Sequence, residues 1–142
     1  MGRRVMAGLT ASDVEELLRA APYHRWLDLR VVELTKDRIE LTASWREEWI
    51  GNPESRATHG GILASLLDLA ADWALTGTTG RGVPTVDLTV NYLRAALPGD
   101  LRVIGRLIRP GRQVSVAEAE VLDQDGKTVA IGRGTFLSAV AQ

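Results

Sequence analysis

The stretch HGGILASLLDLAADWAL, residues 59–75, decides the fold of this chain. Its large apolar side chains recur at the spacing of an α-helix, and its alanines allow other elements to approach closely. Two glycines open the apolar run. The pattern predicts a central helix over about residues 60–75 that is buried nearly all round.

The sequence on both sides of this helix alternates apolar and polar residues, which is typical of half-buried strands. We expect strands over residues 29–35, 38–45, 85–95, 101–109, 112–122 and 127–137, with a loop over residues 77–82. Asp125-Gly126 predicts a tight hairpin turn before the last strand. The order is two strands, the helix, and then four strands in a meander. We therefore predict an α+β fold in which an antiparallel sheet wraps around one helix.

An additional helix is expected near the N-terminus, over about residues 11–21. Thr10 or Ser12 can cap its start, and Ser12 with Glu15 has the spacing of a capping box. Pro22 is expected to end this helix.

The composition excludes several classes of protein. A chain of 142 residues with 45% hydrophobic residues has the size and composition of a single globular domain, here residues 1–142. It has no cysteine and only two histidines, so thiolate chemistry is excluded and a multi-histidine metal site is not expected. A net charge of −1 argues against general nucleic-acid binding. No apolar run suits a membrane span or a secretory signal, so we expect a cytoplasmic protein and no membrane partner.

The start of the central helix carries the residues with chemical potential. The first N–H groups of a helix have no partner within it, and they can polarise a carbonyl as an oxyanion hole does. Asp68 lies mid-helix among leucines, where a carboxylate is costly unless it is paired or serves a reaction. Each residue also has a structural explanation: Gly60-Gly61 for tight packing, His59 as a helix cap or core residue, and Asp68 for a buried hydrogen bond.

The combination resembles a known family. His59-Gly60-Gly61 followed by Asp68, with Asn52 upstream, is similar to the HGG motif of the PaaI-type hotdog thioesterases, of the 4-hydroxybenzoyl-CoA thioesterase-like superfamily. The likeness runs from about residue 22 to 138 and includes VPTVDLTVNY (residues 83–92), Arg109-Pro110-Gly111-Arg112 and Asp125-Gly126-Lys127. It implies a hotdog fold, a homodimer or homotetramer, and hydrolysis of acyl-CoA or acyl-carrier thioesters. Neither a metal nor another cofactor is implied, since CoA is part of the substrate.

The resemblance also implies roles for single residues. Asp68 matches the family's carboxylate, which acts as nucleophile or as base for a water. Gly60 or Gly61 matches the glycine whose N–H polarises the thioester carbonyl. Asn52 matches the asparagine that helps to hold this carbonyl or the water, and His59 matches an orienting histidine. Thr85 falls where related enzymes carry a hydroxyl near the water.

The spacing of these residues argues independently for a site shared between subunits. Asp68 lies eight residues after Gly60, which is about 12 Å along a helix. One side chain cannot span that distance to a carbonyl held at its own helix start. The expected polar face of Thr85, Asp87, Thr89 and Asn91 also suits a strand near an interface or a ligand.

The arginines and tryptophans allow two interpretations each. Arginines 94, 102, 106, 109 and 112 fit either a solvated sheet face or contacts to the phosphates of CoA. We assign the CoA contact to the turn of Arg109, Gly111 and Arg112. Trp45 and Trp49 fit either ordinary packing or the lining of an acyl pocket.

These features together predict a thioester hydrolase. Two other functions remain open: a hotdog hydratase or dehydratase with an acid–base pair such as Asp68 and His59, and a non-catalytic module that binds acyl-CoA. Release of thiol from a saturated acyl-CoA would distinguish a hydrolase from a hydratase or dehydratase. Turnover of an acyl-CoA would distinguish an enzyme from a module that only binds.

Overall fold

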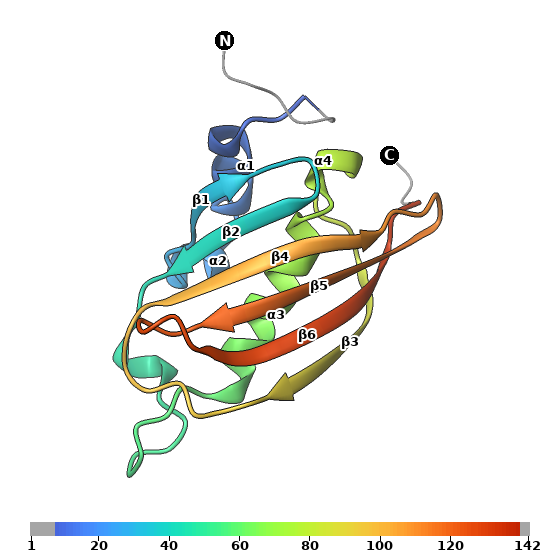
Figure 1. Cartoon of the computed structure of the whole chain (residues 1–142). Helices are drawn as coiled ribbons and strands as arrows, with labels where there is room; N and C mark the ends of the chain where they lie inside the picture. Colours follow the sequence, from blue (N-terminus) through green and yellow to red (C-terminus); the bar gives the residue numbers. More distant parts are fainter. Residues whose placement is uncertain (1–7, 140–142) are drawn as a thin grey trace.

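The computed structural model describes residues 8–139 of the chain and contains one six-stranded antiparallel sheet. The strands are β1 (Arg30–Leu34), β2 (Arg38–Ala43), β3 (Thr85–Tyr92), β4 (Leu101–Arg109), β5 (Val114–Leu122) and β6 (Thr128–Leu137). The sheet curves around a long helix, α3 (Gly60–Trp73), which packs on one of its faces (Figure 1). The predicted α+β architecture and the hotdog fold are confirmed.

The position of β3 corrects the predicted meander. The order across the sheet is β1-β2-β4-β5-β6-β3, so only the last three strands in the chain form a meander. β3 pairs with β6, at the edge of the sheet opposite β1 (Figure 1). Alternation along one strand indicates which face is buried but not which strand lies beside it, and this is why the local pattern misplaced β3.

The central helix is less buried than its composition predicts. Leu63, Leu66, Leu67, Ala70 and Ala71 form the buried side of α3 against the sheet. A different side is partly or fully exposed, and it carries Gly61, Ser65, Asp68 and Asp72, which recur every three or four residues. The prediction of burial nearly all round was therefore wrong for the side that bears both aspartates.

β4 and α3 approach each other closely at Gly105. A Cβ added to Gly105 of β4 would collide with the carbonyl group of Ala70 in α3. The two backbones are thus in direct contact, and the absence of a side chain sets the spacing between helix and sheet.

Two short helices cover the end of the sheet near β1. α1 (Ala11–Leu18) starts with a capping box between Thr10 and Asp13, not between Ser12 and Glu15. The helix ends earlier than predicted, and Pro22 begins a separate helix, α2 (Pro22–Trp26), because proline suits the first turn of a helix.

Two further short helices lie in segments that we expected to be irregular. A 3-10 helix spans Glu47–Trp49, and α4 (Thr76–Thr79) occupies part of the expected loop at residues 77–82. α4 ends at Gly80, which adopts a left-handed conformation. Within the described residues no helix is long and apolar enough to cross a membrane.

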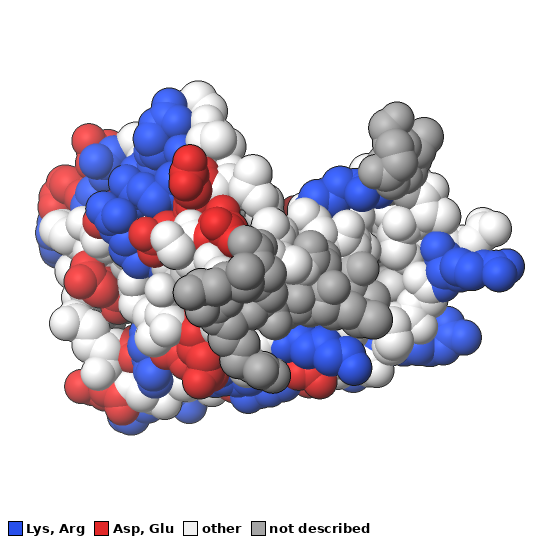
Figure 2. Space-filling view, turned by 90° about the horizontal axis from the view of Figure 1, so that it is seen from above, with Lys and Arg blue, Asp and Glu red and all other residues white. Residues whose placement is uncertain are grey.

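Charged side chains of both signs mix on the surface. Figure 2 shows basic and acidic residues interspersed over one end of the molecule. Ion pairs such as Arg102–Glu40 at 3.2 Å and Arg106–Glu120 at 3.4 Å link neighbouring strands. Such partly exposed pairs contribute little stability each, and the exposure of both arginine side chains supports the solvated-face interpretation for these two arginines.

Candidate active site

His59 organises the start of α3. It is the N-cap residue, and its Nδ1 accepts the N–H of Gly61 at 2.8 Å. The N–H of Ile62 donates to the carbonyl of His59 at 2.9 Å. Among residues 8–139, the structure shows no acceptor for the N–H of Gly60. Of the two glycines proposed from the sequence, Gly60 is therefore the one with an amide free to bind a ligand.

Gly60 borders a hollow of about 330 Å³ between the start of α3 and the end of β3. The hollow is lined by Thr58, Gly60, Leu63, Tyr92, Leu93, Arg94, Ala95 and Ala96. The Tyr92 hydroxyl donates to the carbonyl of Gly60 at 3.0 Å, and a Cβ on Gly60 would lie 3.2 Å from the Tyr92 ring. The backbone of Gly60 is thus accessible because this residue has no side chain.

Asp68 and Thr85 are in direct contact. The Thr85 hydroxyl donates to Oδ1 of Asp68 at 2.7 Å, which joins the middle of α3 to the first residue of β3. Asp68 is partly exposed and Thr85 is exposed. The bond orients the carboxylate and leaves its second oxygen for another partner. The structure thus brings together two of the residues proposed from the sequence.

A β-bulge places Thr85 on the helix side of the sheet. Thr85 pairs with Phe136 and Asp87 pairs with Thr135, so Val86 is an extra residue in β3. The extra residue reverses the side to which Thr85 points relative to Asp87, Thr89 and Asn91. The predicted common polar face of these four residues was therefore wrong, because strict alternation does not hold through a bulge.

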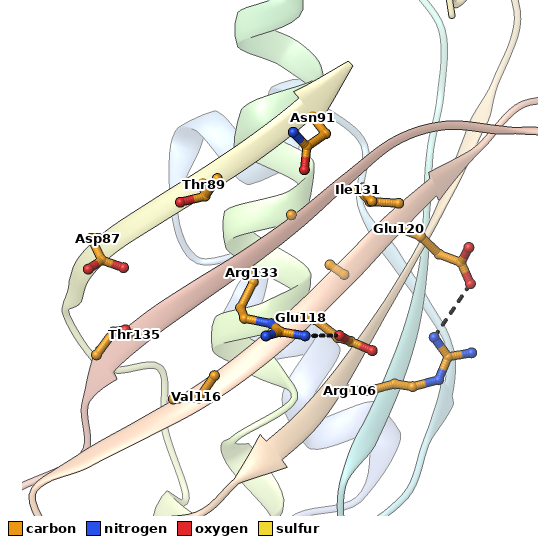
Figure 3. A pocket seen from close by; sticks show the side chains of 12 residues that line it. Asp87, Thr89, Asn91, Arg106, Val116, Glu118, Glu120, Ile131, Arg133 and Thr135 are labelled. Atoms are coloured by element: carbon orange, nitrogen blue, oxygen red, sulfur yellow. Dashed lines mark hydrogen bonds and ion pairs between the residues drawn. The ribbon is translucent and has the colours of Figure 1, made fainter. Parts of the chain in front are cut away.

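The other three polar residues of β3 line a separate hollow of about 780 Å³ on the sheet face away from α3 (Figure 3). Figure 3 shows Asp87, Thr89 and Asn91 on β3, beside the ion pairs Arg133–Glu118 and Arg106–Glu120. This hollow is larger than the one at Gly60, but Asp68 and Thr85 do not line it. The two residues proposed from the sequence for the reaction, Asp68 and Thr85, therefore lie on the helix side of the sheet.

A second carboxylate accompanies Asp68 on the same side of α3. Asp72 lies one turn further along, and its Oδ1 accepts the N–H of Val83 at 2.8 Å. Burial raises the pKa of Asp72 to about 7; the negative charge of Asp68 acts in the same direction, while the Val83 hydrogen bond opposes it. Asp72 is not among the residues proposed from the sequence, although its spacing of four residues from Asp68 places both carboxylates on one side of a helix.

Asn52 lies in the exposed loop that precedes His59. Its side-chain oxygen accepts the N–H of Glu54 at 2.9 Å and that of Ser55 at 3.3 Å, which closes a turn. In the described structure this oxygen therefore stabilises the loop. The same loop is held to the 3-10 helix by two hydrogen bonds between Arg56 and Glu47.

The turn assigned to CoA lies at the far end of the sheet from Gly60. Arg109 and Arg112 are exposed, and the backbone of Gly111 is held by the hydroxyls of Ser115 and Ser138. This turn adjoins the end of β6 and the start of β3, whereas Gly60 adjoins the end of β3. Within one chain the structure therefore does not bring this turn to the start of α3. The arginine that does line the hollow at Gly60 is Arg94.

The tryptophans belong to the core and its edge. Trp49 is fully buried, and Trp45 packs against the buried cluster. Neither lines the hollow at Gly60, which supports packing over an acyl pocket within the single chain.

A potential metal site is not found in residues 8–139, which hold no cluster of three His, Cys, Asp or Glu side chains suited to an ion.

Comparison with known proteins identifies the class to which this fold and site belong. The family model described as "Thioesterase superfamily" matches residues 57–130, slightly more than half of the chain. The chain therefore belongs to the thioesterase superfamily, and it is a PaaI-type hotdog protein of the thioesterase and esterase class.

Individual relatives extend this likeness over most of the chain. The medium/long-chain acyl-CoA thioesterase YigI of Salmonella typhimurium is 28% identical over 131 residues, 82% of this chain and 84% of YigI. The acyl-coenzyme A thioesterase PaaI of Escherichia coli is 34% identical over 80 residues, 56% of each protein. A solved structure of a thioesterase-superfamily protein is 46% identical, with a TM-score of 0.87 and coverage of 89% of this chain and 96% of that one.

Proposed function

We propose that this protein hydrolyses an acyl-CoA, or an acyl group on a carrier protein, to the free acid and the thiol. The observation that carries the proposal is the hydrogen bond between Thr85 and Asp68 on the exposed side of α3. It presents a carboxylate with one free oxygen, and the open amide of Gly60 lies about 12 Å away at the start of the same helix. The relatives named as acyl-CoA thioesterases support the same substrate class.

The proposed reaction needs two functions from the chain. Asp68 either removes a proton from a water that attacks the thioester carbon or attacks that carbon itself. The N–H of Gly60, at the positive end of the helix dipole, stabilises the negative charge that develops on the carbonyl oxygen. The C–S bond then breaks and CoA leaves as the thiolate, which takes up a proton. If Asp68 attacks first, a water hydrolyses the resulting anhydride and restores the carboxylate.

These two functions cannot meet at one substrate within a single chain. Gly60 and Asp68 are separated by about 12 Å along α3. β3 offers a way to bring in a second copy, because it is an edge strand with exposed apolar residues, among them Val86 and Tyr92. An exposed edge of this kind readily pairs with another strand.

Antiparallel pairing of two β3 strands would assemble the site. Thr85 at one end of β3 is bonded to Asp68, and Tyr92 at the other end is bonded to Gly60. A pairing centred between Leu88 and Thr89 places Thr85 of one subunit opposite Tyr92 of the other. Asp68 of one chain then lies near the Gly60 amide of its partner, which gives two equivalent sites in a homodimer.

The direct test is a panel of acyl-CoA substrates with a thiol-detecting reagent. We expect thiol release by the wild type and loss of it in Asp68→Asn. Turnover of a saturated acyl-CoA excludes a hydratase, and turnover of any thioester excludes a module that only binds. Absence of thiol release across acyl chain lengths, with both CoA and carrier-protein substrates, would contradict the proposal.

Mixed dimers test the shared site. Asp68→Ala and Gly60→Val proteins are each expected to be inactive alone. In a verified heterodimer one site contains both intact residues, so part of the activity should return after subunit exchange. If heterodimers are no more active than the two parents, the site is not shared in this way.

A further inference from the structure

Asp72 is a partly buried carboxylate for which the proposed reaction has no use. It lies one turn after Asp68 on the same side of α3, and its Oδ1 accepts the N–H of Val83 at 2.8 Å. Val83 is the residue two positions before Thr85, in the segment that leads into β3. The two carboxylates of α3 thus bind the same short segment at positions two residues apart.

Each residue from Val83 to Thr85 has one polar group that is held by a hydrogen bond. The N–H of Val83 is bound by Asp72, the carbonyl of Pro84 accepts the N–H of Leu137 at 2.9 Å, and the Thr85 hydroxyl is bound by Asp68. Val83 as a whole is only 5% exposed. A buried N–H without an acceptor is costly, so Asp72 determines where Val83 can lie.

The sheet holds Thr85 through its own pairing and through the preceding bond from Leu137 to Pro84, but no regular ladder continues directly after it. Thr85 pairs with Phe136, but the ladder is interrupted directly afterwards by the bulge at Val86. The position of the Thr85 hydroxyl therefore depends on the segment before it as well as on the ladder after it. Asp72 is the anchor of that preceding segment on α3.

We infer that Asp72 is a positioning residue for hydrolysis: by holding Val83 it keeps the Thr85 hydroxyl on the carboxylate of Asp68. This inference rests on the proposed function. Asp72 acts through Val83 and Thr85, and it contacts no reacting atom.

The ionisation of Asp72 gives this role a signature in the pH dependence. Burial, together with the charge of Asp68, places the pKa of Asp72 at about 7. The charged group that faces it from α3 is Asp68, the segment of residues 83–85 that packs against it has no titratable side chain, and Arg81 lies two residues before Val83. An ionised carboxylate is a stronger acceptor than a neutral one, so Asp72 should hold Val83 more firmly above this pH.

The experiment measures acyl-CoA hydrolysis per folded molecule for Asp72→Ala, Asp72→Asn, Thr85→Val and the double variant Asp72→Ala/Thr85→Val. We expect Asp72→Ala and Thr85→Val each to lower kcat about tenfold, with KM within about twofold, as for the misplacement of one hydrogen bond. The double variant should be no slower than the slower single variant, because both changes remove the same contact.

The pH profile separates positioning from a purely structural role. The wild-type rate should rise through a step near pH 7, measured from about pH 5.5 to 8.5. Asp72→Asn keeps a side-chain oxygen for Val83 but cannot ionise, so it should stay active and lose this step. Asp125→Asn, which removes an acidic charge from the exposed turn between β5 and β6, should keep the step.

Several results would overturn the inference. The first is a double variant whose fold-loss in kcat equals the product of the losses in Asp72→Ala and Thr85→Val. This would show that Asp72 does not act through Thr85. An Asp72→Asn enzyme with the wild-type step, or an Asp72→Ala enzyme with wild-type kcat, would leave Asp72 only a role in folding. The proposed function would still stand in these cases, since it fails on a different result: absence of thiol release by the wild type with every acyl thioester.

Discussion

His59 accepts the amide hydrogen of Gly61 through Nδ1, at 2.8 Å. This bond makes the histidine a helix cap, and it also removes one of the two glycine amides from the set that can bind substrate. The neighbouring Gly60 amide is the donor that remains, on the side of the hollow that Tyr92 borders. In the HGG motif, His59 is thus the helix cap, Gly60 has the free amide donor, and Gly61 has the amide donor that His59 binds.

Replacement of His59 should show how much of its contribution to stability and activity comes from capping α3. Asparagine is a good N-cap residue, whereas alanine is a poor one. We expect His59→Ala to lose about 1 kcal/mol of unfolding free energy and His59→Asn to lose only a few tenths. Both should keep the activity per folded molecule within about tenfold, since the Gly60 amide remains. Denaturant unfolding beside steady-state kinetics measures this, and loss of all turnover in a stable His59→Asn would assign the ring a direct catalytic role.

The two glycines should respond differently to a side chain. A Cβ on Gly60 would point at the Tyr92 ring in the hollow, while a Cβ on Gly61 would meet Nδ1 of His59 at 3.0 Å. We expect Gly60→Val to fold and to lose about 10²–10³ in kcat, the usual cost of a lost oxyanion donor. Gly61→Ala should instead lower the melting temperature with less effect on kcat. A folded Gly60→Val enzyme with normal kcat would remove the helix start from the mechanism.

Asp68→Asn tests the carboxylate with little change of shape. The amide oxygen can still accept the Thr85 hydroxyl, so the fold should remain intact. We expect kcat to fall several hundred-fold or more, about 4 kcal/mol of barrier, because the amide is neither base nor nucleophile. Binding of a non-hydrolysable acyl-CoA analogue should persist. Turnover within about threefold of wild type would contradict the role of Asp68.

Asp72 should make the stability of the fold depend on pH. Its pKa of about 7 in the folded chain is above that of an unfolded aspartate, so the folded state retains a proton that the unfolded state has lost. Stability therefore falls as pH rises from about 4 to about 7 and stays lower above that range. Asp72→Asn should be more stable than wild type at pH 8, by at most about 4 kcal/mol, with the difference vanishing near pH 4. An equal difference at both pH values would show that Asp72 does not titrate in this way.

The strongly periodic elements could be predicted from the sequence. The helix at residues 60–75 is found at Gly60–Trp73, and all six strands exist within a few residues of the expected ranges. The contact between Asp68 and Thr85 lies within the residue set that the HGG resemblance implied. These features depend on local patterns or on motif residues, which a single sequence displays directly.

The remaining features depend on contacts between distant segments. The bulge at Val86 exists only in the pairing of β3 with β6, and it alone turns Thr85 towards α3. The placement of β3 at the sheet edge likewise follows from tertiary packing. Pro22 was expected to stop one helix and instead begins another, since proline fits both positions. The role of Asp72 required knowledge of where Val83 lies.

The contact between Gly105 and Ala70 limits which substitutions the protein can accept during evolution. Any side chain at Gly105 would push α3 away from β4, and Asp68 would move with the helix because it lies two residues before Ala70. Thr85 belongs to the far edge of the sheet and would not follow. In the proposed mechanism a side chain at Gly105 would therefore disturb the contact between Asp68 and Thr85 as well as the packing of α3, although Gly105 itself lies in the middle of the sheet and lines neither hollow beside β3.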